Sequence, residues 1–309
     1  MFNNRLSFTF EYYSRKTSDL IMNRPLFPSS GYDTVTENVG EMKNSGVEFT
    51  ISGTPINTRN FRWDITLLGA HNTNKITKLY GGLDNLAPSN VFIQKVGYAR
   101  YAFYIVKHAG VDPDTGKQLY YMKENGEQIT TDSYAKANAA RDDDNLVGKR
   151  EPDIQGSFTN SFTLFRNLDI SFMFVYSLGG KVFDSGYMNL METRNAGTTY
   201  HKDFYEKRWK KPGDITDVPS SASVPIYQTD YYLTNASYLS FKNFSIGYTF
   251  SGEKLKKAGV GSIRLVATGN NIHTWSHRKG MDPQYDFYGQ TNYTYAPSRS
   301  YTLGLELNF

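Results

Sequence analysis

The chain has 309 residues, of which 15% are aromatic, yet its mean hydropathy is −0.54 and its formal net charge is only +4. The basic residues are scattered along the chain, which argues against a nucleic-acid partner. The sequence has no apolar run of about 18 residues, so no transmembrane helix is expected, and the absence of cysteine excludes disulfides and thiolate metal sites.

The first third of the chain alternates apolar and polar residues in three stretches, as strands with one apolar face do. These stretches cover residues 5–14, 46–53 and 61–70. A polar segment from Thr17 to Lys43 separates the first two, and we expect it to be a long loop. A short turn containing Pro55 separates the second and third.

The middle of the chain begins with a long segment, residues 72–153, before alternation resumes at residues 156–164 and 168–176. Inside the long segment, the sequence Asp-Pro-Asp-Thr-Gly at 112–116 is a turn signal between two β-like stretches. We therefore expect a β-hairpin within a surface loop. The two later strands are separated only by residues 165–167, which predicts a tight turn.

The last third begins with another long excursion, residues 179–235, in which residues 204–211 have helical character. Strand alternation resumes at 239–250. It changes phase by one residue near Asn243, which predicts a β-bulge.

The final two strands follow a basic connection at 253–261, where we expect one helical turn. The first of these strands contains Arg264, which we expect on the same polar face as Glu306 of the second, close enough for an ion pair. The terminal strand has an unbroken apolar face and ends on an aromatic residue, a pattern typical of outer-membrane barrels. We interpret that face as an assembly signal formed by Tyr301, Leu303, Leu305, Leu307 and Phe309.

The pattern as a whole is about eight strands whose connections alternate between short and long. The short connections lie near 54–60, 165–167 and 251–261, and the long ones run from about 25 to about 80 residues. Compact soluble domains rarely carry several structureless loops of that length. We therefore predict an all-β fold, a transmembrane antiparallel β-barrel with short periplasmic turns, long extracellular loops and aromatic residues at the strand ends.

Five segments resemble the C-terminal part of the SusC/RagA-like TonB-dependent outer-membrane transporters, in the same order and spacing. The resemblance implies a large closed barrel of the 22-stranded class with a plugged lumen. The plug, the TonB box and the earlier strands would lie outside this sequence. The segments are NRLSFTFEYYSRKTSDLI at 4–21, NVGEMKNSGVEFTISG at 38–53, YAFYIVKHAGVDPDTGKQLYY at 101–121, ASYLSFKNFSIGYTF at 236–250 and SIRLVATGNNIHTWSHRKGMDPQ at 262–284.

The start of the sequence fits this interpretation. Residues 1–5 form neither the basic nor the apolar region of a signal peptide, although an outer-membrane protein must be exported. We therefore expect residues 1–309 to be the C-terminal part of a longer chain.

The resemblance also implies a function and its partners. The whole protein would import glycan or peptide fragments across the outer membrane of a Gram-negative bacterium. A SusD/RagB-like surface lipoprotein would cover the barrel, TonB would act through the N-terminal part, and the barrel assembly machinery would insert the protein.

The loop before the terminal strand supplies the best candidates for contact with a ligand or with the lipoprotein. Aromatic faces stack on sugars and provide rigid contact area, and they are equally common at protein interfaces. Packing of the loop on itself is the alternative. The candidate residues are Tyr285, Phe287, Tyr288, Tyr293 and Tyr295.

No arrangement for catalysis is found, because nucleophile motifs and phosphate-binding loops are absent. We therefore expect no enzyme activity, no catalytic residue and no cofactor. His273, His277 and Asp282 lie close in sequence, but on strand and loop rather than on one helix face. The run Asp142–Asp144 offers oxygen ligands for calcium, although a solvated charged loop is the favoured explanation.

Two other interpretations remain open from the sequence. A self-standing barrel of about eight strands could act as an adhesin or a passive pore. A soluble all-β protein could bind carbohydrate. Dependence on detergent separates both barrels from the soluble protein, and a plug encoded upstream separates the transporter from the small barrel.

Overall fold

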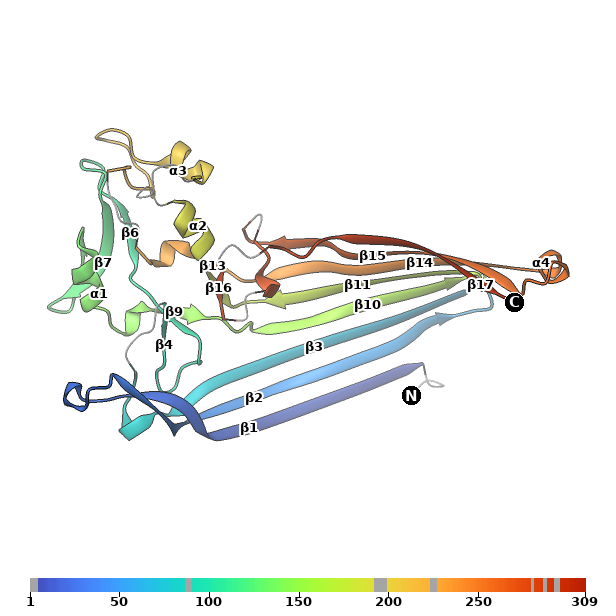
Figure 1. Cartoon of the computed structure of the whole chain (residues 1–309), viewed down its shortest axis with the longest axis horizontal. Coiled ribbons are helices and arrows are strands. Elements are labelled where there is room, and N and C mark those ends of the chain that lie inside the picture. The colour runs from blue at the N-terminus through green and yellow to red at the C-terminus, as the bar shows by residue number, and fades with distance from the viewer. Residues whose placement is uncertain are drawn as a thin grey trace.

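Eight long antiparallel strands form one sheet, which we call the wall (Figure 1). The computed structural model describes residues 5–86, 91–191, 199–222, 227–278, 281–285, 288–291 and 295–309. Neighbours in the wall follow chain order, so it is a meander. From one edge to the other the strands are β1 (Leu6–Pro25), β2 (Thr34–Asn57), β3 (Phe61–Lys78), β10 (Ile154–Leu164), β11 (Leu168–Leu178), β14 (Tyr238–Ser251), β15 (Ser262–Ser276) and β17 (Ser300–Asn308).

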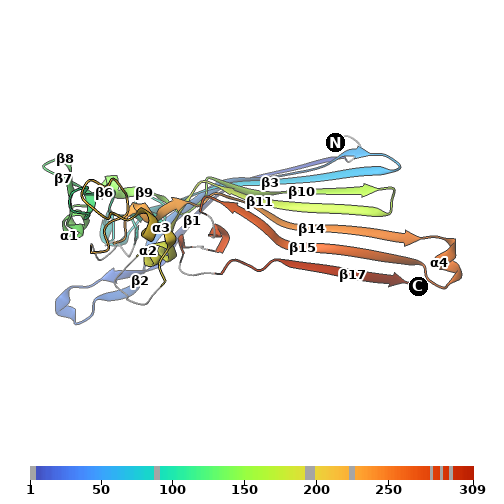
Figure 2. The same cartoon turned by 90° about the horizontal axis from the view of Figure 1, so that it is seen from above.

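The connections at one end of the wall are short, as the sequence predicted. They are residues 58–60, residues 165–167 and residues 252–261, the last containing the helical turn α4 (Glu253–Lys257). We call this the short-turn end. Figures 1 and 2 show that both termini lie there and that α4 projects beyond the strands. The wall is not closed on itself, because β1 and β17 occupy its two edges.

The prediction of a long loop from Thr17 to Lys43 is wrong. The strands β1 and β2 continue through most of it and are joined by residues 26–33. They pair up to Pro25 and Thr34, with register shifts near Leu20. A strand of about 9–11 residues spans a bilayer, so the rest of this hairpin extends past the wall (Figure 2). Outside lipid neither face needs to be apolar, and the alternation therefore fades from the sequence.

The wall has one apolar and one polar face, and the strand register aligns them across all eight strands. Leu305 pairs with Leu265, which pairs with Tyr248, which pairs with Leu168. These residues lie on the apolar face, which continues through Phe162, Trp63, Phe49 and Phe10 on strands nearer the other edge. The polar face carries the alternate positions, mainly serine, threonine and charged residues.

The predicted bulge in β14 is confirmed. Met173 pairs with Asn243 and Phe174 pairs with Phe241, so Lys242 is the extra residue. Phe241 and Phe244 therefore both contribute to the apolar face, where Phe241 stacks on Phe174 at 4.8 Å between ring centroids. The bulge keeps the aromatic side chains on one face across the change of phase.

The three long connections are not structureless loops. The described residues of 79–153, 179–237 and 277–299 fold together at the other end of the wall into what we call the loop body (Figure 1). It contains three small sheets, formed by β4 (Phe92–Ile93), β5 (Ala102–Tyr104) and β9 (Leu146–Lys149); by β6 (His108–Val111), β7 (Gln118–Glu124) and β8 (Glu127–Thr131); and by β12 (Lys181–Asp184), β13 (Leu233–Asn235) and β16 (Gln290–Thr291).

Short helices complete the loop body. Its α-helices are α1 (Tyr134–Ala139), α2 (Ser185–Leu190) and α3 (Lys202–Lys207). The helix expected at 204–211 therefore exists but begins and ends earlier. The 3-10 turns of the chain are Pro28–Ser30, Tyr80–Gly82, Asp143–Asn145, Asp230–Tyr232 and Pro283–Tyr285. None of the described helices is long and apolar enough to cross a membrane.

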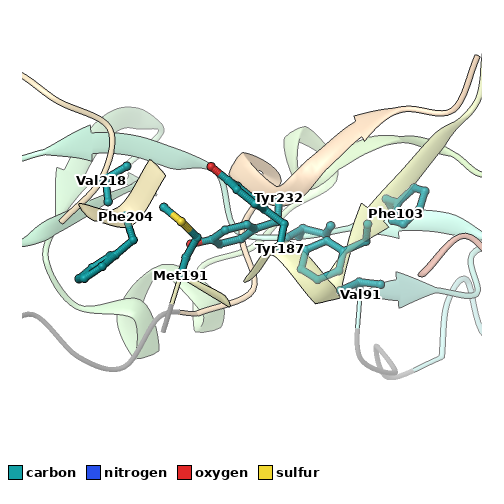
Figure 3. Close-up of a cluster of buried hydrophobic side chains, with 9 residues drawn as sticks. Val91, Phe103, Tyr187, Met191, Phe204, Val218 and Tyr232 are labelled. Atoms are coloured by element: carbon teal, nitrogen blue, oxygen red, sulfur yellow. The ribbon is translucent and has the colours of Figure 1, made fainter. Parts of the chain in front are cut away.

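The main hydrophobic core of the protein lies in the loop body rather than in the wall. Figure 3 shows it, with Tyr187 and Met191 packed near Tyr232 and with Phe103 close to Val91. These residues come from two connections that are far apart in sequence. A third connection joins them through β16, which pairs in parallel with β12. The core therefore fixes the loop body as one unit above the wall.

The hairpin predicted around residues 112–116 is confirmed within this unit. The strands β6 and β7 pair on either side of the turn, and the Gly116 amide donates to the Asp112 carbonyl at 2.8 Å. Asp112 also accepts the Asp114 amide through its side chain at 2.9 Å, so Asp112 is a turn residue. Residues 98–108, in contrast, do not form one strand.

Candidate ligand-binding site

A pocket of about 480 Å³ opens where the polar face of the wall meets the loop body. We call it the polar-face pocket. Its floor is a row of paired residues on four neighbouring strands, Ala70, Gln155, Ser177 and Tyr238. Register alone places these side chains in line, because directly opposed residues of antiparallel strands point to the same face.

Asparagine side chains line one side of this pocket. The Asn74 amide nitrogen donates to the Asn44 oxygen at 2.8 Å, which joins β3 to β2. The Asn72 oxygen accepts the hydroxyl of Tyr13 at 2.9 Å. The backbone amide of Arg100 donates to the Asn74 oxygen at 2.8 Å, so the same residues tie the loop body to the wall.

Charged residues from the loop body form the opposite side. Arg100 lies over the ring of Tyr101, with 5.5 Å between the guanidinium carbon and the ring centroid. Arg150 donates to the carbonyl of Pro283 at 3.0 Å. Glu151 lies beside it, and its Oε2 atom is buried without a hydrogen-bond partner among the described residues.

Burial raises the pKa of the Glu151 carboxyl above its ordinary value, because removal from water disfavours the charged form. Hydrogen bonding to its own backbone and the nearby charges of Lys149 and Arg150 oppose the shift. A carboxyl held in this way binds a cationic or hydrogen-bond-donating group that replaces the lost water. The pocket therefore combines amides, two aromatic rings, two cations and one under-satisfied carboxyl.

Of the aromatic candidates in the last long loop, one contacts a residue that lines this pocket. Tyr288 packs edge-on against Tyr101, a lining residue, with 5.8 Å between centroids. Tyr295 is 96% exposed. The backbone of Tyr285 belongs to the 3-10 turn Pro283–Tyr285, but its side chain lies outside the described residues, as do Phe287 and Tyr293.

A second, larger hollow of about 990 Å³ lies inside the loop body, where the last two long connections meet. Arg278 stacks on the ring of Tyr187 at 3.9 Å and its Nε atom lies 3.3 Å from Asp184 Oδ2. Asp184 also accepts the Tyr187 amide at the start of α2 and the hydroxyl of Thr291. This cluster holds the residues around β16 against β12.

The terminal strand has the predicted facing. Tyr301, Leu303, Leu305 and Leu307 pair with Gly269, Ala267, Leu265 and Ile263 on the apolar face. Gly269 is also paired with Phe244 of β14, and a Cβ atom at Gly269 would lie 2.4 Å from the ring of Phe244. Phe309 is 85% exposed.

Arg264 and Glu306 lie opposite one another on the polar face, as predicted, with 3.8 Å between Nε and Oε2. Arg264 binds Asp169 more closely, through two hydrogen bonds of 2.6 and 2.7 Å. Gly247 leaves room for this pair, because a Cβ atom there would lie 2.2 Å from the guanidinium. The bidentate geometry makes the pair a strong cross-strand link.

The aspartate run that could have held calcium is engaged by lysines instead. Asp142 and Asp144 both contact the ammonium group of Lys123, and Asp143 contacts that of Lys95 at 2.5 Å. These contacts lower the pKa of Asp142 and raise those of both lysines. Within the described residues, no group of three or more histidine or acidic side chains is arranged to hold a metal.

Sequence reasoning missed most of the polar-face pocket. Asn44 lies before the stretch predicted for its strand, and Asn72 and Asn74 lie after the stretch predicted for theirs. Arg100, Arg150 and Glu151 lie in a segment interpreted as a surface loop. The one available signal was the alternate spacing of Asn72 and Asn74, which continues the polar face of β3.

Comparisons with known proteins agree with one another. The profile of the family described as "TonB dependent receptor-like, beta-barrel" matches residues 1–272. TonB-dependent receptor P3 of Formosa agariphila is 28% identical over all of this chain, which covers 33% of that protein. TonB-dependent receptor SusC of Bacteroides thetaiotaomicron is 28% identical over 99% of this chain, which covers 30% of it.

Among solved structures, that of the RagAB peptide transporter superposes on the whole chain with a TM-score of 0.85 at 28% identity. The chain covers 34% of the matched transporter chain. The chain therefore spans about a third of the length of the relatives it matches. These relatives are named as receptors and transporters, not as enzymes.

Proposed function

Because the chain belongs to the TonB-dependent receptor-like β-barrel family, we propose that it forms the C-terminal barrel wall and loops of an outer-membrane importer. In this proposal residues 1–309 are one part of a larger closed barrel whose plug and earlier strands belong to the rest of the protein. The short-turn end faces the periplasm and the loop body faces the outside. The whole protein takes up glycan or peptide fragments in a TonB-dependent manner.

The observation that carries the proposal is the division of the wall into an apolar and a polar face. An apolar outer face suits hydrocarbon, and a polar inner face suits a water-filled or plugged lumen. The polar-face pocket lies at the mouth of that lumen in this arrangement. The opposite charges of Arg100 and Glu151 favour a peptide with ionised ends over a neutral glycan.

The loop body is the proposed docking surface for a SusD/RagB-like surface lipoprotein. The exposed rings of Tyr288 and Tyr295 support this assignment, because exposed aromatic residues are common at protein interfaces. Co-purification from outer membranes through a tag on the receptor tests it. Loss of the lipoprotein from the Tyr288→Ala and Tyr295→Ala double variant, but not from a Tyr32→Ala control on the β1–β2 hairpin, is expected.

The transport proposal is tested by uptake in cells carrying the complete receptor. Labelled peptides and labelled oligosaccharides are supplied to cells with and without TonB. Saturable uptake that requires TonB is expected. Uptake that is linear in concentration and unchanged without TonB would instead favour the passive pore.

The pocket is tested by Glu151→Gln in the same cells. We expect weaker uptake of peptides that have a free amino terminus, because the anionic partner is removed. Glu127→Gln, on the exposed hairpin between β7 and β8, is the matched control. Equal uptake by both variants would exclude Glu151 from the binding site.

A further inference from the structure

The three short connections of the wall carry an excess of positive charge. They contain five basic residues and one acidic residue, Glu253. All five basic side chains are exposed. We call them the cationic rim, which consists of Arg59, Arg166, Lys254, Lys256 and Lys257.

The protein does not neutralise this rim itself. Among the described residues, none of its five side chains takes part in an ion pair, and Arg166 only donates to the carbonyl of Arg59 at 3.4 Å. Basic residues a few positions further into the wall are paired, by contrast. Arg62 binds Asp64 and Arg264 binds Asp169. The rim residues therefore differ from Arg62 and Arg264 in having no acidic partner among the described residues.

The helical turn α4 presents its lysines outward. Its one large apolar residue, Leu255, is half-buried, whereas the three lysines are exposed. At 100° per residue Lys257 lies almost opposite Leu255, and Lys254 and Lys256 lie on the two flanks between them. Figures 1 and 2 show that α4 extends further from the wall than either of the other short connections. The lysines therefore reach beyond the ends of the strands.

An aromatic band lies on the apolar face next to the rim. Tyr248 and Phe250 pack edge to face at 4.6 Å and are 40% and 45% exposed. Phe165, in the turn that holds Arg166, is 70% exposed. Aromatic side chains of this kind sit at the level of lipid headgroups in membrane barrels. The rim is thus placed just beyond the hydrocarbon, where headgroup phosphates lie.

We propose that the cationic rim binds anionic phospholipid headgroups of the periplasmic leaflet. The inference rests on the proposed function, because it takes the short-turn end as periplasmic. Lysine and arginine near an anionic lipid surface attract it, each contributing on the order of a fivefold gain in affinity. Lysines on α4 supply point charges on flexible stems, which suit mobile headgroups better than one fixed partner.

The test measures lipid retention by the complete receptor. Receptor purified from outer membranes in mild detergent is exchanged into nanodiscs containing phosphatidylglycerol and phosphatidylcholine, and bound lipid is counted by native mass spectrometry. Wild type is expected to enrich phosphatidylglycerol. The Lys254→Gln, Lys256→Gln and Lys257→Gln triple variant is expected to lose about tenfold or more of that enrichment.

The matched control is the triple variant Lys136→Gln, Lys210→Gln and Lys211→Gln, whose exposed lysines lie in the loop body. It should retain phosphatidylglycerol as wild type does. Enrichment that is equal in the rim and control variants would overturn the proposal. Displacement of the lipid by an equal concentration of inorganic phosphate would also overturn it, since the site would then hold a free anion.

Two further measurements keep the result interpretable. If the triple variant fails to assemble, Arg59→Gln with Arg166→Gln removes rim charge without altering α4. In wild type, 1 M salt should abolish the enrichment, because the screening length falls from about 10 Å at 0.1 M to about 3 Å.

TonB-dependent uptake without lipid preference would refute only this inference. Lipid preference without such uptake would refute only the proposed transport.

Discussion

At the scale of single residues, the face on which a side chain of the wall lies follows from alternation alone, and the polar exception at Asn160 has a partner for its oxygen. Asn160 lies on the apolar face yet is only 5% exposed. Its oxygen accepts the indole N–H of Trp63 at 2.9 Å across the β3–β10 pair. A polar atom on this face is thus kept from lipid by a neighbouring aromatic donor. The sequence pattern predicts the rule but not this pairing, which depends on register.

The face of the terminal strand can be tested by placing a charge on either side of it. Arginine at Leu305 would meet lipid, at a cost of about 2–4 kcal/mol near the midplane, whereas arginine at Asn308 would face the lumen. We expect Leu305→Arg to impair assembly of the complete receptor far more than Asn308→Arg. Heat-modifiable electrophoretic mobility in outer-membrane fractions measures this. Equal assembly of the two variants would contradict the facing.

Glu151 should make stability depend on pH in a defined direction. Its folded pKa is raised, so the folded state favours the protonated form. Wild-type stability should therefore fall as pH rises from the ordinary value of 4.5 through the raised folded value. Glu151→Gln lacks this dependence and should be more stable than wild type at neutral pH, with the difference disappearing near pH 4.

Thermal unfolding of both proteins between pH 4 and 7.5 provides the measurement, and Glu127→Gln serves as the exposed control. If the unfolding temperatures of wild type and Glu151→Gln change in parallel with pH, burial does not disfavour the charged form of the Glu151 carboxyl.

At the scale of elements, the sequence predicted the wall well and the loop body poorly, for one physical reason. Strands in contact with lipid must have an apolar face, so β10, β11 and β17 carry a strict period of two. The elements of the loop body are only two to seven residues long, too short to carry a period. Their burial comes from packing of Phe103, on one connection, with Phe183 and Tyr232, on another. One sequence does not show which residues of separate connections pack together.

The contact between the last two long connections depends on Arg278. Replacement by alanine removes the cation–π contact with Tyr187 and the ion pair with Asp184, together about 1–2 kcal/mol. We expect Arg278→Ala to increase hydrogen exchange in β16 and β12 without affecting β10. Arg299→Ala, an exposed arginine of the same loop, is the control. Unchanged exchange in Arg278→Ala would show that backbone pairing and the side-chain hydrogen bonds of Gln290 and Thr291 hold β16 without Arg278.

At the scale of the whole molecule, the two halves of the structure are stabilised differently. The wall buries few of its apolar side chains, and in the proposed arrangement lipid covers its apolar face while polar contacts link the side chains of its polar face. The loop body has a core of its own, as a soluble domain does. The outward facing of Leu303 and Leu305 follows from this division, because no protein layer covers the apolar face of the wall in the described residues.

Deletion of Phe309 tests the proposed assembly signal. Removing one exposed terminal ring should leave synthesis and export intact but slow insertion by the barrel assembly machinery. The comparison is outer-membrane yield against induction of a periplasmic folding-stress reporter. Phe309→Tyr, which keeps an aromatic ring at this position, is the matched control. Wild-type yield after loss of Phe309 would reject the signal.

The shared core of the loop body has a consequence for how the cell surface is recognised. Residues that are neighbours on its outer side belong to three connections, so an epitope of ordinary size is discontinuous in sequence. Antibodies raised against peptides copied from one connection should bind denatured protein and fail on intact cells. Antibodies raised against the folded receptor should show the opposite behaviour. A single substitution in the core, such as Tyr232→Ala, should then abolish several surface epitopes at once.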